Sequence, residues 1–417
     1  MKITLLNDSY APTIDGVANV VKNYAENLHN DGFGVQVVTP SHPEADDSAS
    51  PWDVLRYPSI DMRRKIGYVA GMPFSPETLK RVRGFEPELL HTHCPIASAL
   101  LALSLQKEVN APLVLTYHTR YDIDFAKALK NKYLTKLAVS TLVSIINACD
   151  EVWTVSRGAG ESLREIGYTG SYTVMPNGVD IPRTRMSGEE IRCLTGETDG
   201  GGPLFLFVGR LMWYKGIRII LDALSKLRDA GFAFRMAFVG SGKDEAEIRT
   251  YAEEQGLADR VRFLGMLSDR RTLCAWYCRA DVMLFPSTFD TNGLVVREAA
   301  ACGLPAVLVR GSCAAEGVED GVNGFLIDEN AESLCETLKK LCGEPEKMRQ
   351  VGENASRDLY FSWQDAVRRA EERYPAIIEN YKSGLYAGKK RGDELFKING
   401  ELMELTEKIK EFKITRK

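Results

Sequence analysis

The sequence lacks the features that would place the protein in a membrane, outside the cell or on nucleic acid. The most apolar run, Leu137–Cys149, is interrupted by serine, threonine and asparagine and is too short to span a bilayer. The chain turns polar at Asn7 and Asp8, which is too early for a signal-peptide core. A net charge of −4 gives no sign of a nucleic-acid partner. We therefore expect a cytoplasmic protein without a membrane-spanning segment.

A disulfide framework is also absent. The nine cysteines are odd in number and irregularly spaced, as expected of reduced, buried thiols. Cys274 and Cys278 are spaced to share one helix face, and we interpret them as core residues rather than metal ligands. The segment His91-Thr-His93-Cys94 has no fourth ligand at a suitable spacing, so we interpret it as non-metal as well.

The glycine fingerprint of dinucleotide-binding proteins is missing. The loop Ala11–Val17 has one glycine, Gly16, where that fingerprint needs three, which disfavours a nicotinamide-dependent dehydrogenase. Instead, strands and helices alternate from the start. Lys2–Leu6 predicts a strand, Val17–His29 an amphipathic helix and Gly34–Thr39 the next strand. This order is typical of a doubly wound parallel sheet.

A second series of the same kind begins after a stretch of loop residues between about Val179 and Pro203. Its predicted strands are Leu204–Val208, Arg235–Val239, Val261–Leu264, Val282–Phe285 and Ala306–Val309. With 417 residues, of which 44% are hydrophobic, the chain can form two cores. We predict an α/β fold of two Rossmann-like domains facing across a cleft, 1–185 and 186–363, followed by a helix over 364–385 that packs back toward the first domain.

The last segment, 386–417, predicts an amphipathic tail helix. Its apolar residues recur at alternate spacings of three and four: Leu395, Ile398, Leu402, Leu405, Ile409 and Phe412. The segment is shorter than three heptads, which favours docking on its own domain. A homodimer seam and a membrane-surface helix are the alternatives.

One turn concentrates the candidate chemistry. An apolar run ending at Pro286 predicts a strand, and Gly293–Cys302 predicts a helix. Asp290 and Asn292 therefore lie where open α/β sheets bind ligands, and Asp290 and Glu298 can reach two sides of one bound molecule. Backbone N–H groups at the start of the helix are suited to cradle an anion: those of Asn292, Gly293 and Leu294.

Together these motifs resemble the family 4 glycosyltransferases of the GT-B fold, over about residues 1–385. The segment from Asp290 to Glu298 matches the family's Glu-seven residues-Glu motif, although the first acid here is Asp. The segment from Gly209 through Lys215 to Gly216 matches its Gly-Arg-Leu…Lys-Gly motif. The resemblance implies a nucleotide-sugar donor held between the domains, transfer with retention of configuration, and no requirement for a metal ion.

The resemblance also implies roles for individual residues. Arg210 and Lys215 would hold the donor diphosphate and stabilise the charge that develops as it leaves. Glu298 would bind the ribose hydroxyls and Asp290 a hydroxyl of the donor sugar. His118 would orient the sugar and polarise it, rather than act as an ordinary base. The remaining donor-binding candidates are Gly16, Gly240 and Ser241.

The acceptor side is predicted from charge. Phe125–Leu137 is a basic amphipathic stretch that suits an anionic bilayer, with a solvated helix face as the alternative; Arg63–Lys65 and Lys389–Arg391 add further basic runs. Asp122-Ile-Asp124 imitates the metal motif of another glycosyltransferase fold, and we interpret it as non-metal. We assign six residues to the acceptor or membrane: Asp15, Arg120, Lys127, Lys130, Lys132 and Lys136.

Short segments around His91, Thr116 and Asp290 look most like the bacterial enzymes that glucosylate diacylglycerol. The resemblance therefore predicts a peripheral enzyme on the inner face of the cell membrane that moves glucose, or galactose, from a UDP-sugar to a glycerolipid hydroxyl. One alternative is transfer to a soluble sugar, sugar phosphate or cell-wall precursor. Others are a nucleotide-sugar epimerase and a non-catalytic nucleotide-sugar or lipid-binding scaffold. The scaffold is disfavoured because four charged residues of the motifs are intact: Arg210, Lys215, Asp290 and Glu298.

Overall fold

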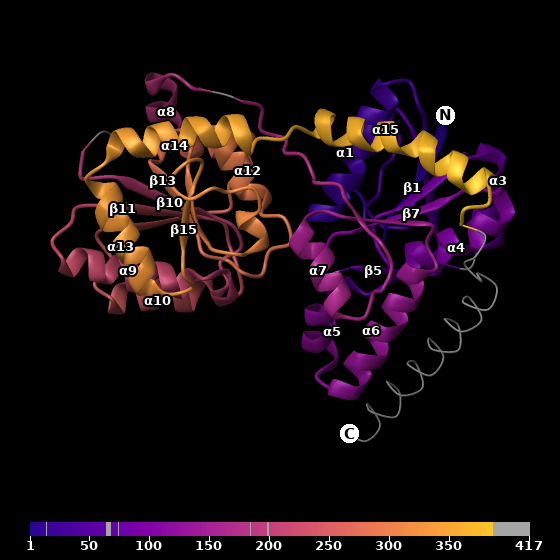
Figure 1. Ribbon diagram of the computed structural model, residues 1–417, viewed down its shortest axis with the longest axis horizontal. Coiled ribbons are helices and arrows are strands. Elements are labelled where there is room, and N and C mark those ends of the chain that lie inside the picture. Colours follow the sequence, from indigo (N-terminus) through magenta and orange to yellow (C-terminus); the bar gives the residue numbers. More distant parts are fainter. Residues whose placement is uncertain (14, 64–67, 74, 184, 198–199, 387–417) are drawn as a thin grey trace. The chain divides into compact units, whose positions relative to one another are not determined.

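The computed structural model describes residues 1–386 except 14, 64–67, 74, 184 and 198–199 (Figure 1). The described chain forms two compact units. The N-terminal unit comprises Met1–Asn177 and the described residues from Trp363 onward, and the C-terminal unit comprises Gly178–Ser362. The predicted tail helix, Arg64 and Lys65, and the basic run Lys389–Arg391 lie outside the described residues.

The N-terminal unit is built on a seven-stranded parallel sheet with the order β3-β2-β1-β6-β7-β8-β9. Its strands are β1 (Lys2–Leu6), β2 (Gly34–Pro40), β3 (Asp53–Tyr57), β6 (Leu89–Thr92), β7 (Leu113–Tyr117), β8 (Glu151–Thr154) and β9 (Thr173–Val174). A small antiparallel pair, β4 (Ser59–Asp61) and β5 (Val69–Gly71), stands apart from this sheet. Because parallel sheets are covered on both faces, the central strands are mostly apolar, and every residue of β6 and β7 is buried.

Helices connect these strands and cover the sheet (Figure 1). They are α1 (Gly16–Asn30), α3 (Pro76–Phe85), α4 (Ala97–Val109), α5 (Tyr121–Leu129), α6 (Lys132–Asn147) and α7 (Arg157–Glu165). The amphipathic pattern predicted for the first helix is confirmed, since its buried residues include Val20, Val21, Tyr24 and Leu28.

The C-terminal unit repeats this architecture with a six-stranded parallel sheet in the order β12-β11-β10-β13-β14-β15. Its strands are β10 (Leu204–Val208), β11 (Arg235–Val239), β12 (Val261–Gly265), β13 (Val282–Phe285), β14 (Ala306–Val309) and β15 (Phe325–Ile327). Its helices are α8 (Gly188–Thr195), α9 (Ile217–Asp229), α10 (Glu245–Glu254), α11 (Arg270–Arg279), α12 (Leu294–Ala301), α13 (Ala331–Cys342) and α14 (Pro345–Asp358), with short 3₁₀ turns η1 (Trp213–Lys215) and η2 (Cys313–Ala315). The predicted α/β class with two Rossmann-like halves is confirmed.

The chain passes between the units twice. It enters the C-terminal unit after Asn177, and there Val179 pairs with Ser362, just before the chain returns. The helix α15 (Trp363–Lys382) follows and belongs to the N-terminal unit, where Trp363 packs edge-on against Tyr24 and Arg373 forms an ion pair with Glu151 at 2.8 Å. This long helix therefore completes the first unit with residues from the far end of the sequence.

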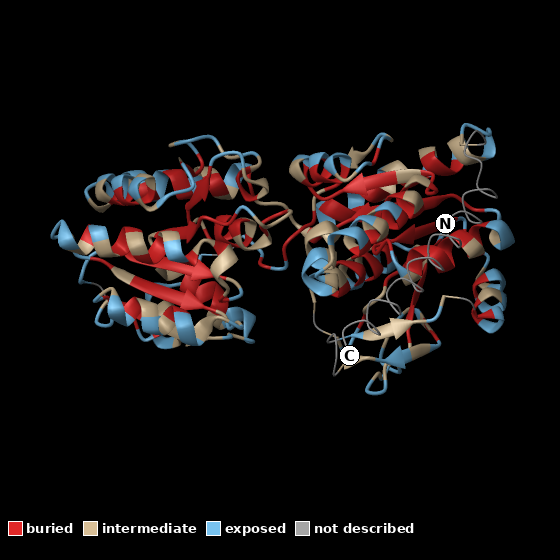
Figure 2. Cartoon of the chain, turned by 90° about the horizontal axis from the view of Figure 1, so that it is seen from below, coloured by how far each residue is buried: buried red, intermediate tan, exposed pale blue. Residues whose placement is uncertain are grey.

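Figure 2 shows how the buried residues gather on the strands and on the inward faces of the helices of each unit. Two edge strands, β3 and β15, are not predicted from the sequence. β3 mixes charged and apolar residues, and β15 is apolar but only three residues long, so neither presents an apolar run as long as those that mark the central strands.

Candidate functional site

The turn between β13 and α12 has the predicted strand-to-helix form. Gly293 lies just before α12 with φ 61°, a left-handed conformation that glycine adopts without strain. A Cβ atom there would also lie 2.8 Å from the Cβ of Ala314. The N–H groups that open α12 have no acceptor within the helix, so this turn presents donors to an anion.

Lys215 and Asp290 meet at this turn although they are far apart in sequence. The Lys215 Nζ lies 2.5 Å from the Asp290 carboxylate, and the Ser287 hydroxyl donates to the other carboxylate oxygen at 2.5 Å. The Lys215 side chain is only 8% exposed. Gly216 permits this approach, because a Cβ at that position would lie 2.2 Å from the Pro286 carbonyl oxygen. The ammonium group is thus held in one place at the start of α9.

Glu298 is buried on α12 and is held by two groups of α11. It accepts a hydrogen bond from the Tyr277 hydroxyl at 2.9 Å and from the Arg270 guanidinium at 3.0 Å. Burial raises the pKa of Glu298, while Arg270 and Tyr277 lower it. Arg270 also pairs with Asp180 at 2.7 Å. Each carboxylate oxygen retains a lone pair, so Glu298 can still accept hydroxyl groups from a ligand.

The Asn292 side chain is buried, yet its Nδ2 and Oδ1 atoms have no hydrogen-bond partner among the described residues. Buried amides are nearly always satisfied, because an unpaired polar group away from water is costly. This amide therefore leaves its NH2 group as donor and its carbonyl oxygen as acceptor for a molecule or water at the turn. The prediction from sequence used only the Asn292 backbone.

Arg210 follows β10 and is exposed. No carboxylate of the described chain forms an ion pair with it, in contrast to Lys215. The loop that carries it is fixed to the loop after β11, since the Leu211 N–H donates to the Ser241 carbonyl at 3.0 Å. Gly240 packs so closely that a Cβ would lie 2.0 Å from the Gly209 carbonyl oxygen. The C-terminal unit thus places Gly240 and Ser241 beside the arginine loop.

The N-terminal unit buries three histidines at the carboxyl ends of β6 and β7. His118 Nε2 lies 3.1 Å from His93 Nδ1, and the two rings stack. His91 bonds the Tyr374 hydroxyl at 2.8 Å and the Thr116 hydroxyl at 2.7 Å. Burial lowers the pKa of His118 to about 3. His118 is therefore neutral near pH 7 and suited to hydrogen bonding rather than to proton uptake.

Asp8 was not among the predicted site residues, although it lies two residues after the end of β1. Its carboxylate accepts from the Ala97 and Ser98 N–H groups at the start of α4, at 3.1 and 2.6 Å, and from the Cys94 thiol. Burial raises the pKa of Asp8. Its position after a strand was the available signal, but the contact with α4 arises only in the folded chain.

The two candidate residues of the first loop, Asp15 and Gly16, have different structural roles. Asp15 caps α1, accepting from the Val17 and Ala18 N–H groups at 2.8 Å each. Gly16 is the first residue of α1, and a Cβ there would meet no atom of the described chain within 4 Å. Packing within the protein therefore does not require glycine at Gly16.

The basic stretch Phe125–Leu137 is not one helix. α5 ends at Leu129, Lys130 adopts a left-handed conformation with φ 50°, and Asn131 caps α6. The break leaves four exposed lysines on the two helices and their junction: Lys127, Lys130, Lys132 and Lys136. No helix of the described chain is long and apolar enough to cross a membrane.

Other basic and acidic candidates are already paired. Arg120 forms an ion pair with Asp122 at 3.1 Å, which engages one of the two aspartates of the motif Asp122-Ile-Asp124. Arg63 bonds Asp61 at 3.0 Å and Glu44 at 2.6 Å.

Two family models match the chain. One, described as Glycosyltransferase Family 4, matches residues 14–183, and the other, described as Glycosyl transferases group 1, matches residues 196–358. The two matches together span most of both units. The chain therefore belongs to the family 4 glycosyltransferases of the GT-B fold.

Known proteins agree with this assignment. The alpha-monoglucosyldiacylglycerol synthase of Acholeplasma laidlawii is 24% identical over 369 residues, 85% of this chain and 92% of that protein. The GDP-mannose-dependent alpha-mannosyltransferase of Corynebacterium glutamicum is 24% identical and covers 79% of this chain and 77% of its own length. The crystal structure of Anabaena HepE in complex with UDP has a TM-score of 0.71 at 21% identity and covers 90% of this chain and 100% of that one.

Proposed function

We propose that the protein is a retaining hexosyltransferase that moves glucose from a UDP-sugar to the hydroxyl of a membrane glycerolipid such as 1,2-diacylglycerol. The observation that carries the proposal is the Lys215–Asp290 pair at the start of α9, with the exposed Arg210 on the preceding loop. The name of the Acholeplasma relative supports a diacylglycerol acceptor, and the UDP complex of Anabaena HepE supports a UDP-sugar.

In this proposal the C-terminal unit binds the donor. As the sugar bond breaks, negative charge grows on the leaving diphosphate, and Arg210, Lys215 and the N–H groups that open α12 stabilise it. Glu298 accepts hydrogen bonds from the ribose hydroxyls. Asp290 shares its charge between Lys215 and a hydroxyl of the donor sugar. These fixed positive groups neutralise the leaving charge, so the transfer step requires no metal ion.

The N-terminal unit supplies the neutral groups of the proposed reaction. His118, uncharged near pH 7, orients the sugar through a hydrogen bond while the acceptor attacks from the face that the diphosphate leaves. Gly16 leaves space for the substrates, because the described chain places nothing within 4 Å of its missing Cβ. The proposed retention of configuration follows from this same-face attack.

The exposed lysines of α5, α6 and their junction are the proposed contact with the inner face of the cell membrane. Each lysine near an anionic surface contributes about 1 kcal/mol of attraction. Lys127, Lys130, Lys132 and Lys136 are all exposed, while Leu134 and Ala138 of α6 face the core. Replacing the four lysines by glutamine should weaken binding to anionic liposomes and remove most of its dependence on salt.

A second donor has specific support, because the relative from Corynebacterium is named as dependent on GDP-mannose. The acceptor alternative is a soluble sugar, sugar phosphate or cell-wall precursor. Both alternatives keep the same charged groups of the C-terminal unit for the donor diphosphate. The first differs from the main proposal in the donor, and the second in the acceptor.

The test measures release of UDP from UDP-glucose, with and without anionic liposomes that contain diacylglycerol, followed by mass analysis of the lipid. Lipid-dependent release with a hexosylated product is the expected result. Liposomes without diacylglycerol and GDP-mannose as donor are the controls. If liposomes neither bind the protein nor raise turnover, the lipid acceptor is wrong, and soluble acceptors take its place.

A further inference from the structure

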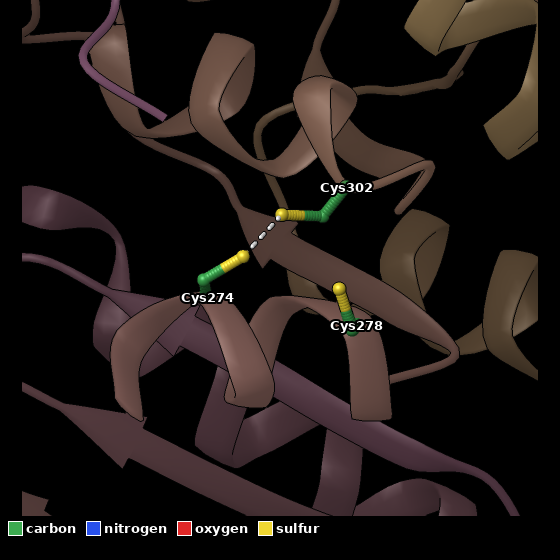
Figure 3. Close-up of side chains that lie close together, drawn as sticks. All are labelled: Cys274, Cys278 and Cys302. Atoms are coloured by element: carbon green, nitrogen blue, oxygen red, sulfur yellow. Dashed lines mark hydrogen bonds between the residues drawn. The ribbon is translucent and has the colours of Figure 1, made fainter. Parts of the chain in front are cut away.

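Three cysteines of the C-terminal unit converge between α11 and α12 (Figure 3). Cys274 and Cys278 lie one turn apart on α11, and Cys302 caps the end of α12. The Cys274 and Cys302 sulfurs are 3.5 Å apart, and all three sulfurs lie within 4.8 Å of one another. The helix spacing of Cys274 and Cys278 predicts core residues; it does not reveal Cys302, which only the packing of α12 on α11 adds.

The arrangement has the dimensions of a metal site. Zinc binds thiolate sulfur at about 2.3 Å, so a tetrahedral ion holds its sulfur ligands about 3.8 Å apart. The observed separations of 3.5 Å and at most 4.8 Å bracket this value. Figure 3 shows the Cys274 and Cys302 sulfurs pointing toward each other and the Cys278 sulfur on the same side of α11. Small rotations of the side chains are enough to close the site.

Two of the three thiols are shielded from water, and the third is accessible enough for an ion to reach the cluster. Cys274 and Cys302 are each 8% exposed, whereas Cys278 is half-buried. Among the described residues, no other three side chains of His, Cys, Asp or Glu bring their ligand atoms close enough together to share one ion. Sulfur ligands without a carboxylate select soft or borderline ions such as Zn²⁺ over Mg²⁺ or Ca²⁺.

We propose that Cys274, Cys278 and Cys302 form a zinc site in which three thiolates and one water molecule bind a single Zn²⁺ tetrahedrally. Three S–H groups release their protons to solvent as three Zn–S bonds form, and no electrons are transferred. A disulfide would join only two of these sulfurs and would need an oxidant, whereas one ion engages all three.

The ion would tie together the two helices that hold Glu298. α11 carries Arg270 and Tyr277, which both hydrogen-bond the Glu298 carboxylate, and α12 carries Glu298 itself. Cys302 lies one turn beyond Glu298 on α12. The zinc site therefore stabilises the C-terminal unit and takes no part in the transfer step, so its test does not depend on the proposed function.

The test uses the full-length protein, freed of metal with a chelator and kept reduced with a phosphine. Co²⁺ is the probe, because thiolate-bound Co²⁺ has a charge-transfer absorption that Zn²⁺ abolishes on displacement. We expect about one equivalent of Co²⁺ per chain, as a single site requires. Cys278→Ser and Cys302→Ser should each lose this absorption, and the matched control Cys335→Ser, at a buried thiol of α13, should keep it.

Two measurements on the unmodified chain keep the test decisive if a variant fails to fold. Zn²⁺ at about a hundred times its Kd should raise the Tm by a few degrees. It should also protect the half-buried Cys278 from alkylation, as located by mass analysis of peptides. Failure of the folded, reduced protein to bind either ion overturns the proposal. So does retention of the Co²⁺ absorption in both folded variants.

Discussion

The two units share one architecture but place opposite chemistry at the carboxyl ends of their strands. The N-terminal unit contains all five histidines of the chain and buries three of them there, uncharged, beside a buried Asp8 with a raised pKa. The C-terminal unit contains no histidine and places ion pairs there instead, Lys215 with Asp290 and Arg270 with Glu298. In the N-terminal unit the buried groups at this edge are neutral histidines, with the ion pair of Arg120 and Asp122 beside them, whereas in the C-terminal unit the buried groups are charged.

The glycines of the matched motifs and of the predicted site also differ between the units. In the C-terminal unit, Gly216, Gly240 and Gly293 are required by the chain itself, because a Cβ at each would lie 2.8 Å or less from a neighbouring atom. In the N-terminal unit, Gly16 is surrounded by open space. A substitution at Gly216 thus tests folding, whereas one at Gly16 tests what binds there.

The largest expected effect is at Lys215. Lys215→Ala should lower kcat about a thousandfold with the fold intact, because the leaving diphosphate loses a placed cation. Steady-state turnover together with circular dichroism measures this. Lys226→Ala, which removes an exposed lysine of α9 paired with Glu332, is the matched control and should remain active. Full activity in the Lys215 variant would refute the diphosphate assignment.

The next largest effects are expected at two glycines, one in each unit. Gly16→Ala should fold as well as the parent, since alanine favours a helix, but lose about a hundredfold in turnover if substrates approach that closely. Gly216→Ala should instead lower the free energy of unfolding by more than about 1 kcal/mol, because its φ of 77° and its contact with Pro286 both oppose a Cβ. Denaturant unfolding and turnover separate the two effects. A destabilised but active Gly16→Ala protein would reverse this interpretation.

Mild acid should weaken the N-terminal unit selectively. The pKa of His118 is about 3 when folded, below its ordinary value of about 6.5, so the unfolded chain binds the proton first. Stability is full above about pH 6.5 and is lost as the pH falls toward 3; His118 alone removes about 1.4 kcal/mol between pH 7.5 and 5.5. Burial also lowers the pKa of His91 and His93, which adds to the loss. Burial raises the pKa of Glu371 to about 7, so this carboxyl binds its proton more readily in the folded chain. As the pH falls, it therefore offsets part of the lost stability.

Hydrogen exchange followed by mass analysis of peptides measures this difference between the units. Peptides of the N-terminal unit should lose protection between pH 7.5 and 5.5, after correction for the intrinsic exchange rate. Peptides from 178–362, which contain no histidine, serve as the internal reference. Equal losses in both units would show that the buried histidines do not control acid stability.

The smallest expected effect is at Glu298. Glu298→Gln keeps the shape of the side chain but removes the charge that pairs with Arg270 and would accept the ribose hydroxyls. The KM for the donor should rise about tenfold with little change in kcat, as for the loss of one charge-assisted hydrogen bond. Glu332→Gln, at an exposed surface pair, is the control. A change confined to kcat would place Glu298 in the reaction rather than in donor binding.

The linear order of apolar runs, loop residues and amphipathic segments was enough to predict the α/β class, the central strands and the strand-to-helix turn at Asp290. Central strands of a parallel sheet are mostly apolar and helices have a period of 3.6, so both leave a local signal. The edge strands leave a weaker signal, because β3 contains Asp53 and Arg56 and β15 has only three residues. The break of the basic stretch at Lys130 was missed as well, because its charge pattern continues across two helices.

By itself, then, the sequence determined which residue types lie at the ends of which strands, and through its motifs the family. Only the tertiary structure decided their partners: Lys215 with Asp290, Glu298 with Arg270 and Tyr277, and His118 with His93. It also brought Cys302 to Cys274 and Cys278. Such contacts join residues that are distant in the chain, and their distances, burial and pKa shifts depend on how the helices pack on the sheets, for which the local sequence carries no signal.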